Sequence, residues 1–300
     1  MYPAEFEYFA PRTVDEALEL LGRYGDEAKI LAGGQSLLPM MKLRIAGPTY
    51  LIDVNRIEGL GGLRQEGDRL VLGALCRHAE VAASPLVRER LPLMADAARL
   101  TADVQVRNRG TVAGSLAHAD PAGDWPAALL ALDTTVQIAG PGGVRAVALA
   151  EFIVDAYTTA LEPAELVVGV SVAIPAAPAG GAYVKFEKRA GDFAVASIGV
   201  QIGLEPGGGG ERCHSVAIGL GALGPTAIRA RAAEDRLRGQ ALDAGRVEEA
   251  AALVQEAAQP FADTRGSVGY KRHLAGVLFG RACAAALDRA RGREVATLHV

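Results

Sequence analysis

The sequence has few cysteines and no long apolar run, and each shortage excludes a class of protein. Its only three cysteines, Cys76, Cys213 and Cys283, are far apart and lack CxxC spacing, so no zinc site or cysteine-ligated iron–sulfur cluster can form locally. No apolar stretch approaches the ~20 residues of a membrane span, and the first residues carry acids where a signal peptide carries bases. We therefore expect a cytoplasmic chain without an integral membrane segment.

Basic charge is also scarce. The net charge is −4, which gives no electrostatic footprint for nucleic acid. Charged residues make up 22% and hydrophobic residues 50% of the 300 residues, so a folded chain of about two domains is favoured over a disordered one.

The order of predicted elements divides the chain in two. Residues 1–175 read as two α/β subdomains, about 1–55 and 56–175. In the first, the capping box Thr13/Glu16 begins a helix, and the strands KILAGG and TYLIDV follow. The stretch GTVAGSLA reads as strand or turn. Residues 174–184, rich in Pro, Ala and Gly, read as a linker. Residues 183–292 read as an α+β domain, with two long strands around a glycine turn and helices starting near Ala227, Val247 and Tyr270.

Two loops combine glycine with small polar residues. The first is AGGQS, with Gly33, Gly34, Gln35 and Ser36, where backbone N–H groups without Cβ atoms nearby can converge on an anion such as pyrophosphate. Taken alone, such a doublet is more often an ordinary turn.

The second loop, RNRGTVAGSLAHADPAGDWP, repeats this composition. It joins Gly110 and Gly114 to Thr111 and Ser115 and ends in two aspartates, of which Asp124 precedes a predicted helix. The two loops can face each other across one elongated phosphate-bearing ligand, with Asp124 accepting from a ribose hydroxyl or a ring edge. Capping of the following helix would explain Asp124 equally well.

Further stretches offer weaker alternatives. The segment KFEKRAGDFA brings Lys185, Asp192 and Phe193 together, as either a cofactor contact or a solvated turn. A metal site at His118, Asp120 and Asp124 matches no known spacing, and neither Ser36 nor Ser115 lies in a nucleophile elbow. GLGALG, residues 219–224, fits a dinucleotide-binding fingerprint, but no second parallel strand ending in an acid follows it, so a buried strand end explains it better.

Eight ordered blocks carry a resemblance over almost the whole chain: FEYFAPRTVDEALELL, LAGGQSLLPMMKLR, LIDVNRI, VRNRGTVAGSLAHADPAGDWPAALLALD, YTTALEPAELV, KFEKRAGDFA, LGPTAIRA and GSVGYKRHLAGVL. With them the chain resembles the flavin-binding medium subunit of the molybdenum hydroxylases, the group of aerobic carbon monoxide dehydrogenase and bacterial xanthine dehydrogenases. The resemblance implies an FAD-binding domain of the vanillyl-alcohol-oxidase (PCMH) type, α/β, followed by a C-terminal α+β domain with an antiparallel sheet. Within this sequence it implies FAD contacts at Ala32, Gly33, Gly34, Gln35, Ser36, Gly110, Thr111, Val112, Ala113, Gly114, Ser115, Asp124, Lys185, Asp192 and Phe193.

One position departs from the family pattern. Relatives usually read TxGGS where this chain has TVAGS, so Ala113 replaces a glycine. A methyl group is tolerable there if the φ angle is negative and costly if it is positive.

The resemblance also implies a function. FAD would collect electrons relayed by a small subunit with two two-iron clusters from a large subunit with the molybdenum cofactor, and would deliver them to an external acceptor, in a dimer of heterotrimers. Three alternatives stay open. They are a self-contained FAD oxidoreductase acting on a small substrate, a flavin-free scaffold that lost FAD through Ala113, and a NAD-binding protein using GLGALG.

Overall fold

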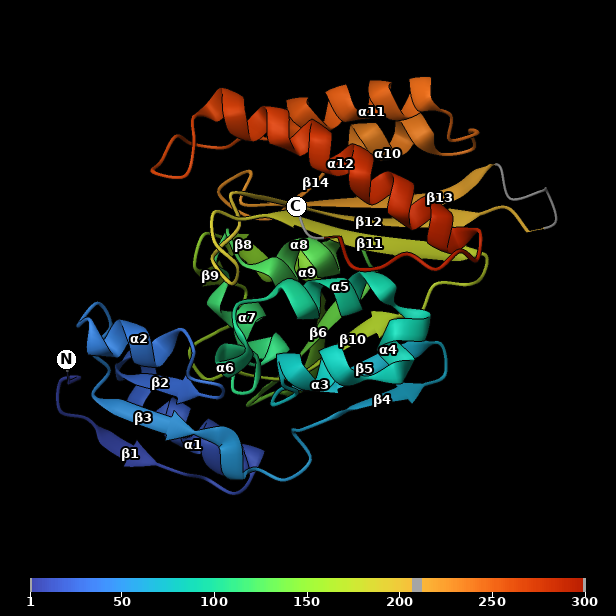
Figure 1. The fold of residues 1–300 in the computed structure, drawn as a ribbon. Helices are drawn as coiled ribbons and strands as arrows, with labels where there is room; N and C mark the ends of the chain where they lie inside the picture. The colour runs from blue at the N-terminus through green and yellow to red at the C-terminus, as the bar shows by residue number, and fades with distance from the viewer. Residues whose placement is uncertain (1, 207–211, 299–300) are drawn as a thin grey trace.

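A computed structural model describes residues 2–206 and 212–298, which form three main sheets in three successive units (Figure 1). The N-terminal unit holds a three-stranded sheet, the middle unit a five-stranded sheet and the C-terminal unit a four-stranded sheet. Each unit surrounds its own cluster of buried apolar side chains, although Tyr183 of the C-terminal unit belongs to the middle cluster.

The N-terminal unit confirms the predicted α/β organisation. Its strands are β1 (Glu7–Phe9), β2 (Ala28–Leu31) and β3 (Tyr50–Asp53), all parallel, in the order β1-β3-β2, with helices α1 (Val14–Tyr24) and α2 (Leu37–Lys42). The Thr13 hydroxyl accepts from the Glu16 N–H at 3.1 Å, as the predicted cap requires. Because β2 and β3 are parallel, residues that follow Leu31 and Asp53 lie at one edge of this sheet.

The middle unit is built on an antiparallel sheet of order β4-β5-β10-β6-β7. Its strands are β4 (Leu63–Glu66), β5 (Arg69–Gly73), β6 (Thr134–Gly140), β7 (Gly143–Ala148) and β10 (Leu166–Ala173), with the small pair β8 (Ile153–Asp155) and β9 (Thr158–Thr159). The helices are α3 (His78–Ala83), α4 (Pro85–Arg90), α5 (Pro92–Leu100), α6 (Val104–Arg107), α7 (Val112–His118), α8 (Asp124–Leu130) and α9 (Leu149–Phe152). Short 3-10 helices occur at Gly25–Glu27 and Val54–Arg56.

The interpretation of GTVAGSLA as strand or turn was wrong. Only Thr111 makes a single bridge, to Arg77, and helix α7 starts at Val112. The Thr111 hydroxyl accepts from the Gly114 N–H at 3.1 Å and so caps the helix. The apolar positions in this stretch pack as one helical face, whereas their alternation with small residues suggested a strand.

The C-terminal unit pairs β11 (Ala179–Phe186), β12 (Ala196–Leu204), β13 (Cys213–Gly221) and β14 (Ile228–Arg229) in an antiparallel sheet. Helices α10 (Arg231–Leu237), α11 (Ala244–Ala257) and α12 (Val268–Ala290) cover its upper face, and α5 and α8 of the middle unit lie against the other (Figure 1). The predicted glycine turn between β12 and β13 falls partly on residues 207–211, outside the described residues.

The linker expected at residues 174–184 is shorter than predicted, because β11 begins at Ala179. The small residues there serve packing. A Cβ atom on Gly180 would lie 2.3 Å from the Ala286 carbonyl oxygen of α12, so only glycine lets the helix approach the sheet this closely. Composition typical of a linker therefore marked a tightly covered strand.

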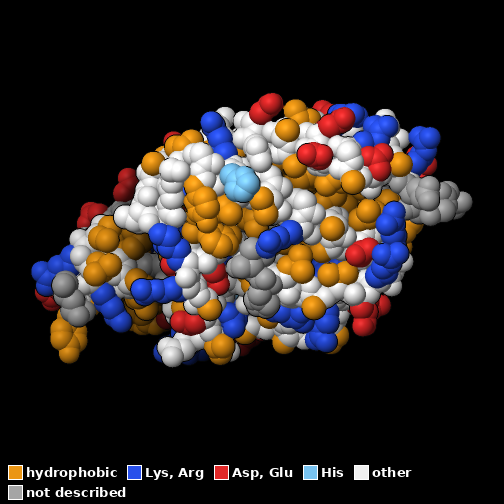
Figure 2. Space-filling model, turned by 45° about the horizontal axis from the view of Figure 1, so that its top comes forward, with side chains coloured by type: hydrophobic (Ala, Val, Ile, Leu, Met, Phe, Trp, Pro, Cys, Tyr) orange, Lys and Arg blue, Asp and Glu red, His pale blue; other side chains and the backbone are white. Residues whose placement is uncertain are grey.

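The charged side chains on one face of the molecule are mixed in sign. On the face in Figure 2, acidic and basic side chains are interspersed. Among the helices of the described ranges, none combines the length and apolar character that crossing a bilayer requires.

Candidate flavin site

The two predicted loops touch at the Gly33–Gly34 doublet. A Cβ atom on Gly33 would lie 2.4 Å from the Arg109 carbonyl oxygen and 2.7 Å from the Gly110 Cα, which a real side chain cannot do. Gly34 has φ +71°, a conformation that L side chains rarely adopt. Close contact at one position and backbone conformation at the next therefore require both glycines.

The first loop presents a run of unsatisfied donors. Within residues 2–206 and 212–298, the N–H groups of Gly33, Gly34, Gln35 and Ser36 have no hydrogen-bond acceptor. The N–H of Leu37, the first residue of α2, likewise has no acceptor among these residues, and the N–H groups of Leu38 and Met40 are bonded back to the Gly34 and Ser36 carbonyls. Successive free backbone donors of this kind suit a polyanion, so the loop fits the pyrophosphate of FAD.

The second loop supplies the other wall. Gly110 packs against the ring of His78, where a Cβ atom would lie 2.7 Å from Nε2, and Gly114 packs against the hydroxyl of Thr111. The side chains of Val112 and Ala113 point into the core, and both are almost fully buried. Thr111 is also buried and its hydroxyl caps α7, so this wall offers a ligand its backbone and the half-buried side chain of Ser115.

Ala113 is accommodated without strain. It is the second residue of α7, and its φ is not positive. Its methyl group belongs to the middle hydrophobic cluster and is 2% exposed. Because φ is not positive at Ala113, alanine in place of the family's glycine costs little here.

Ala113→Gly is accordingly expected to destabilise the protein without improving cofactor binding. The loss of a buried methyl group and the entropy of a helical glycine together cost about 1–2 kcal/mol. Urea unfolding of the apo-protein measures the first effect, and FAD titration is expected to give affinities within about twofold of each other. A large gain in FAD affinity would show that Ala113 impairs the site.

His78 supports the second loop from beneath. Its backbone N–H donates to the Gly110 carbonyl at 3.1 Å, and its Nδ1 accepts from the Trp125 indole N–H at 2.9 Å. Because Nδ1 is an acceptor, the neutral ring carries its proton on Nε2. Burial, followed by the charges of Arg107 and Arg77, lowers the pKa of His78 to about 4.

Stability is therefore expected to fall in mild acid. The unfolded chain protonates this imidazole near its ordinary pKa of about 6.5, whereas the folded protein keeps it neutral down to about pH 4. The contribution is thus fully present above pH 6.5 and is lost as the pH drops, by about 2 kcal/mol between about pH 7.5 and pH 5. Urea unfolding of wild type and His78→Gln at both pH values measures it, with the exposed His214→Gln as control. An equal loss in wild type and His78→Gln would refute this assignment.

Asp124 and Lys185 join the middle and C-terminal units. One Asp124 oxygen accepts from the Tyr183 hydroxyl at 2.7 Å, and the other accepts from Lys185 Nζ at 3.2 Å. The same ammonium donates to the Leu100 carbonyl at 3.0 Å and lies 3.0 Å from a Glu187 oxygen. Burial raises the pKa of the Asp124 carboxyl, while Lys185 and Tyr183 oppose that rise. Asp124 does not cap α8, because it is the first helical residue and Gly123 is the cap.

Asp192 and Phe193 lie in the loop that follows β11. Phe193 is 50% exposed, and the Arg265 guanidinium lies 6.0 Å from its ring centroid. Arg265 also donates to Asp192 at 3.1 Å, and the hydrogen bond from the Phe193 N–H, followed by that from Arg265, lowers the pKa of the Asp192 carboxyl. Glu187, the partner of Lys185, accepts from the Gly191 N–H at 3.0 Å and holds the loop from inside.

The residues of the metal and dinucleotide alternatives have packing and turn roles in the structure. His118 packs against Tyr157, and Asp120 accepts from the Ala122 N–H. No group of three metal-ligating side chains occurs in the part of the chain that the structure describes. The glycines of GLGALG end β13, an antiparallel strand, and Gly219 packs on the Ala127 carbonyl, so the fingerprint marks close packing and not a dinucleotide site.

Sequence reasoning missed Asn55 and Arg77. Both lie beside the loops, and neither occurs in a motif with a known chemical role. The only local signal is the position of Asn55 after a strand parallel to the one that precedes AGGQS.

Two family models match this chain. The FAD binding domain in molybdopterin dehydrogenase matches residues 4–177, and the CO dehydrogenase flavoprotein C-terminal domain matches residues 181–286. The first match contains both glycine loops and the second begins within β11.

Relatives and solved structures agree with these matches over nearly the whole chain. The carbon monoxide dehydrogenase medium chain of Hydrogenophaga pseudoflava is 43% identical over 96% of this chain and 99% of its own. The 6-hydroxypseudooxynicotine dehydrogenase complex subunit alpha of Paenarthrobacter nicotinovorans is 37% identical over 97% of each chain. A carbon monoxide dehydrogenase structure from H. pseudoflava superimposes with a TM-score of 0.92 at 45% identity, covering 96% of this chain and 99% of that one. The chain therefore belongs to the FAD-binding medium subunits of the molybdenum hydroxylase family, the flavoprotein components of these oxidoreductases.

Proposed function

We propose that this subunit takes electrons from iron–sulfur clusters of a partner chain and passes them from FAD to an external acceptor. The observation that carries the proposal is the run of successive N–H groups of residues 33–37 that has no acceptor among the described residues, beside the contact of the two glycine loops. A pyrophosphate supplies the missing acceptors.

The residues divide between holding FAD and supporting the loops that hold it. Ala32, Gly33, Gly34, Gln35 and Ser36 bind the cofactor from one side, and Gly110, Thr111, Val112, Ala113, Gly114 and Ser115 bind it from the other. Asp192 and the exposed Phe193 lie on the loop that meets the ring. When bound, FAD accepts electrons singly or in pairs, and the protein positions it and excludes competing reactions.

Asp124 and Lys185 act on the cofactor indirectly, through the loop that carries Phe193. Both carboxylate oxygens of Asp124 have partners, and the Lys185 ammonium already has three oxygen neighbours inside the chain. Through Glu187 and the Gly191 N–H, this network fixes the loop that carries Phe193. Their contribution to the flavin is therefore the placement of that loop.

The same proposal assigns domains and partners. Residues 1–175 form the FAD-binding domain, with subdomains of about 1–55 and 56–175, and residues 183–292 form the C-terminal domain, each with its own sheet. The partners are a small subunit with two two-iron clusters and a large subunit with the molybdenum cofactor, assembled as a dimer of heterotrimers in the cytoplasm. Relatives whose names read medium chain or subunit of a dehydrogenase complex support a multi-subunit assembly.

Co-expression with the chains encoded beside it tests the proposal. The complex is purified through a tag on this subunit, and its absorption spectrum and the masses of the co-eluting chains are recorded. Flavin bands with two partners, one of which carries iron–sulfur absorbance, are expected. Flavin without partners would favour a self-contained oxidoreductase, and a folded protein without flavin would overturn the FAD assignment.

A further inference from the structure

The Arg77 side chain connects the two glycine loops. One guanidinium nitrogen donates to the Arg109 carbonyl, which belongs to the second loop. The other donates to Asn55 Oδ1 at 2.5 Å. The Asn55 amide in turn donates to the Ala32 carbonyl at 2.8 Å, at the start of the first loop. A chain of three hydrogen bonds therefore runs from one wall of the site to the other.

The backbone around Arg77 is fixed to the second loop. The His78 N–H donates to the Gly110 carbonyl at 3.1 Å, and the Val112 N–H donates to the Cys76 carbonyl at 3.2 Å. Arg77 therefore moves with the second loop, while its side chain reaches across to the N-terminal unit.

Asn55 is fixed to the first loop in the same way. Its side chain bonds Asp53 Oδ1 at 2.6 Å and its N–H bonds the same oxygen at 2.9 Å, directly after β3. Asn55 therefore holds its place at the edge of the N-terminal sheet and presents one oxygen to Arg77. The hydrogen bond between Arg77 and Asn55 therefore joins the second glycine loop to the first.

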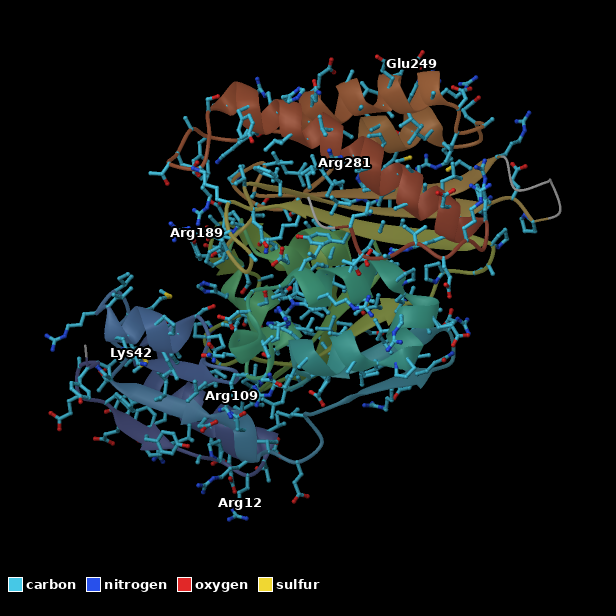
Figure 3. The ribbon with its side chains drawn as sticks, viewed as in Figure 1. Arg12, Lys42, Arg109, Arg189, Glu249 and Arg281 are labelled. Carbon is cyan, nitrogen blue, oxygen red and sulfur yellow. The ribbon has the colours of Figure 1, made fainter. Side chains whose placement is uncertain are left out.

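The hydrogen bonds of Arg77 lie where the two loops are in closest contact. Gly33 lies against the same Arg109 carbonyl that accepts from Arg77. Arg109 lies where the N-terminal unit meets the middle unit (Figure 3). Loss of the Arg77 hydrogen bonds would let the Arg109 carbonyl move away from Gly33 and would increase the separation of the two loops.

We propose that Arg77 and Asn55 are positioning residues that set the separation of the two loops and thereby the affinity for FAD. The inference rests on the proposed function, because it concerns the same site. It differs from a general attraction between positive charge and phosphate, since it needs the planar guanidinium fork that reaches two acceptors at once. A lysine has the charge but not this geometry.

FAD titration of flavin-stripped full-length variants tests the proposal. Arg77→Met is expected to weaken FAD binding by about tenfold or more, and Arg77→Lys is expected to recover only part of that loss. Arg109→Met is the matched control. It removes a charge beside Arg77 but keeps the carbonyl that Arg77 holds, and is expected to stay within about threefold of wild type. Asn55→Ala removes the hydrogen bonds that link Arg77 to the first loop. Because both residues act through the same chain of hydrogen bonds, Arg77→Met/Asn55→Ala is expected to bind FAD as tightly as the single variant with the lower affinity.

The melting temperature of each apo-protein separates positioning from folding. A purely structural role would lower that temperature and leave the affinity of the folded protein unchanged. Equal losses in Arg77→Met and Arg109→Met, full rescue by Arg77→Lys, or additive losses in the double variant would each overturn the inference. If wild type itself binds no FAD, the proposed function fails. If wild type binds and Arg77→Met and Asn55→Ala bind equally well, only this inference fails.

Discussion

Gly33→Ala is expected to weaken FAD binding by about 100-fold or more. The new Cβ atom would lie 2.4 Å from the Arg109 carbonyl oxygen and 2.7 Å from the Gly110 Cα, and both obstacles are backbone atoms. No rotamer change relieves such a contact, so the two loops must separate. Separation of the loops displaces the N–H groups of the first loop that we propose bind the pyrophosphate.

Gly47→Ala is the matched control. Gly47 follows α2 in the same unit, its φ is not positive, and no atom lies within 4 Å of its would-be Cβ. Titration of both flavin-stripped variants with FAD is expected to give near wild-type affinity for Gly47→Ala only. Gly33→Ala affinity within about twofold of wild type would show that the contact between the loops does not determine cofactor binding.

Asp124→Leu is expected to lower the free energy of unfolding by about 3–5 kcal/mol. The substitution leaves the Lys185 ammonium with one carboxylate fewer although its side chain is 1% exposed, and it removes the only acceptor of the Tyr183 hydroxyl within the described residues. The Lys185 ammonium keeps Glu187 at 3.0 Å, so the cost comes from the lost hydrogen bond between Lys185 and Asp124 and from the buried Tyr183 hydroxyl, which is left without its acceptor. The loss acts at the boundary of the middle and C-terminal units.

A second substitution distinguishes the buried charge from a packing defect. Asp124→Leu/Lys185→Met replaces both side chains by apolar ones, and it is expected to recover only part of the lost stability, because Glu187 then loses its cationic partner. Asp103→Ala, which removes an exposed cap from α6, is expected to cost only about 1 kcal/mol. Urea unfolding of the three apo-proteins provides the comparison. A double variant that is less stable than Asp124→Leu would contradict the account.

Local signals predicted most of the fold. The cap of α1 and the strands of the N-terminal unit are read from neighbouring residues, and the structure agrees with them. The two glycine loops were paired because they share a composition, and in the structure they are in contact at Gly33; their binding of one ligand stays a prediction. Ala113 was recognised as the one unusual residue, and only its backbone angle was needed to judge it.

The errors have tertiary causes. Gly180 and Gly181 looked like part of a linker, yet Gly180 lies against α12, and Gly181 lies against Gln201 of β12 and Leu93 of α5. Asn55 and Arg77 carry no motif, and their hydrogen bond joins residues 22 positions apart, so only the packed units reveal it. The role of Lys185 also depends on Leu100 and Asp124, which lie 85 and 61 positions away.

Anaerobic mixing of this subunit with its separately reduced iron–sulfur partner tests the central claim most directly. The iron–sulfur partner is reduced first, the excess reductant is removed, and this subunit is added in its oxidised, FAD-loaded form. The account predicts that the flavin absorption band bleaches as the iron–sulfur absorbance returns to its oxidised form. A flavin that stays oxidised beside the reduced partner, and that bleaches only with a small organic substrate, would contradict the account.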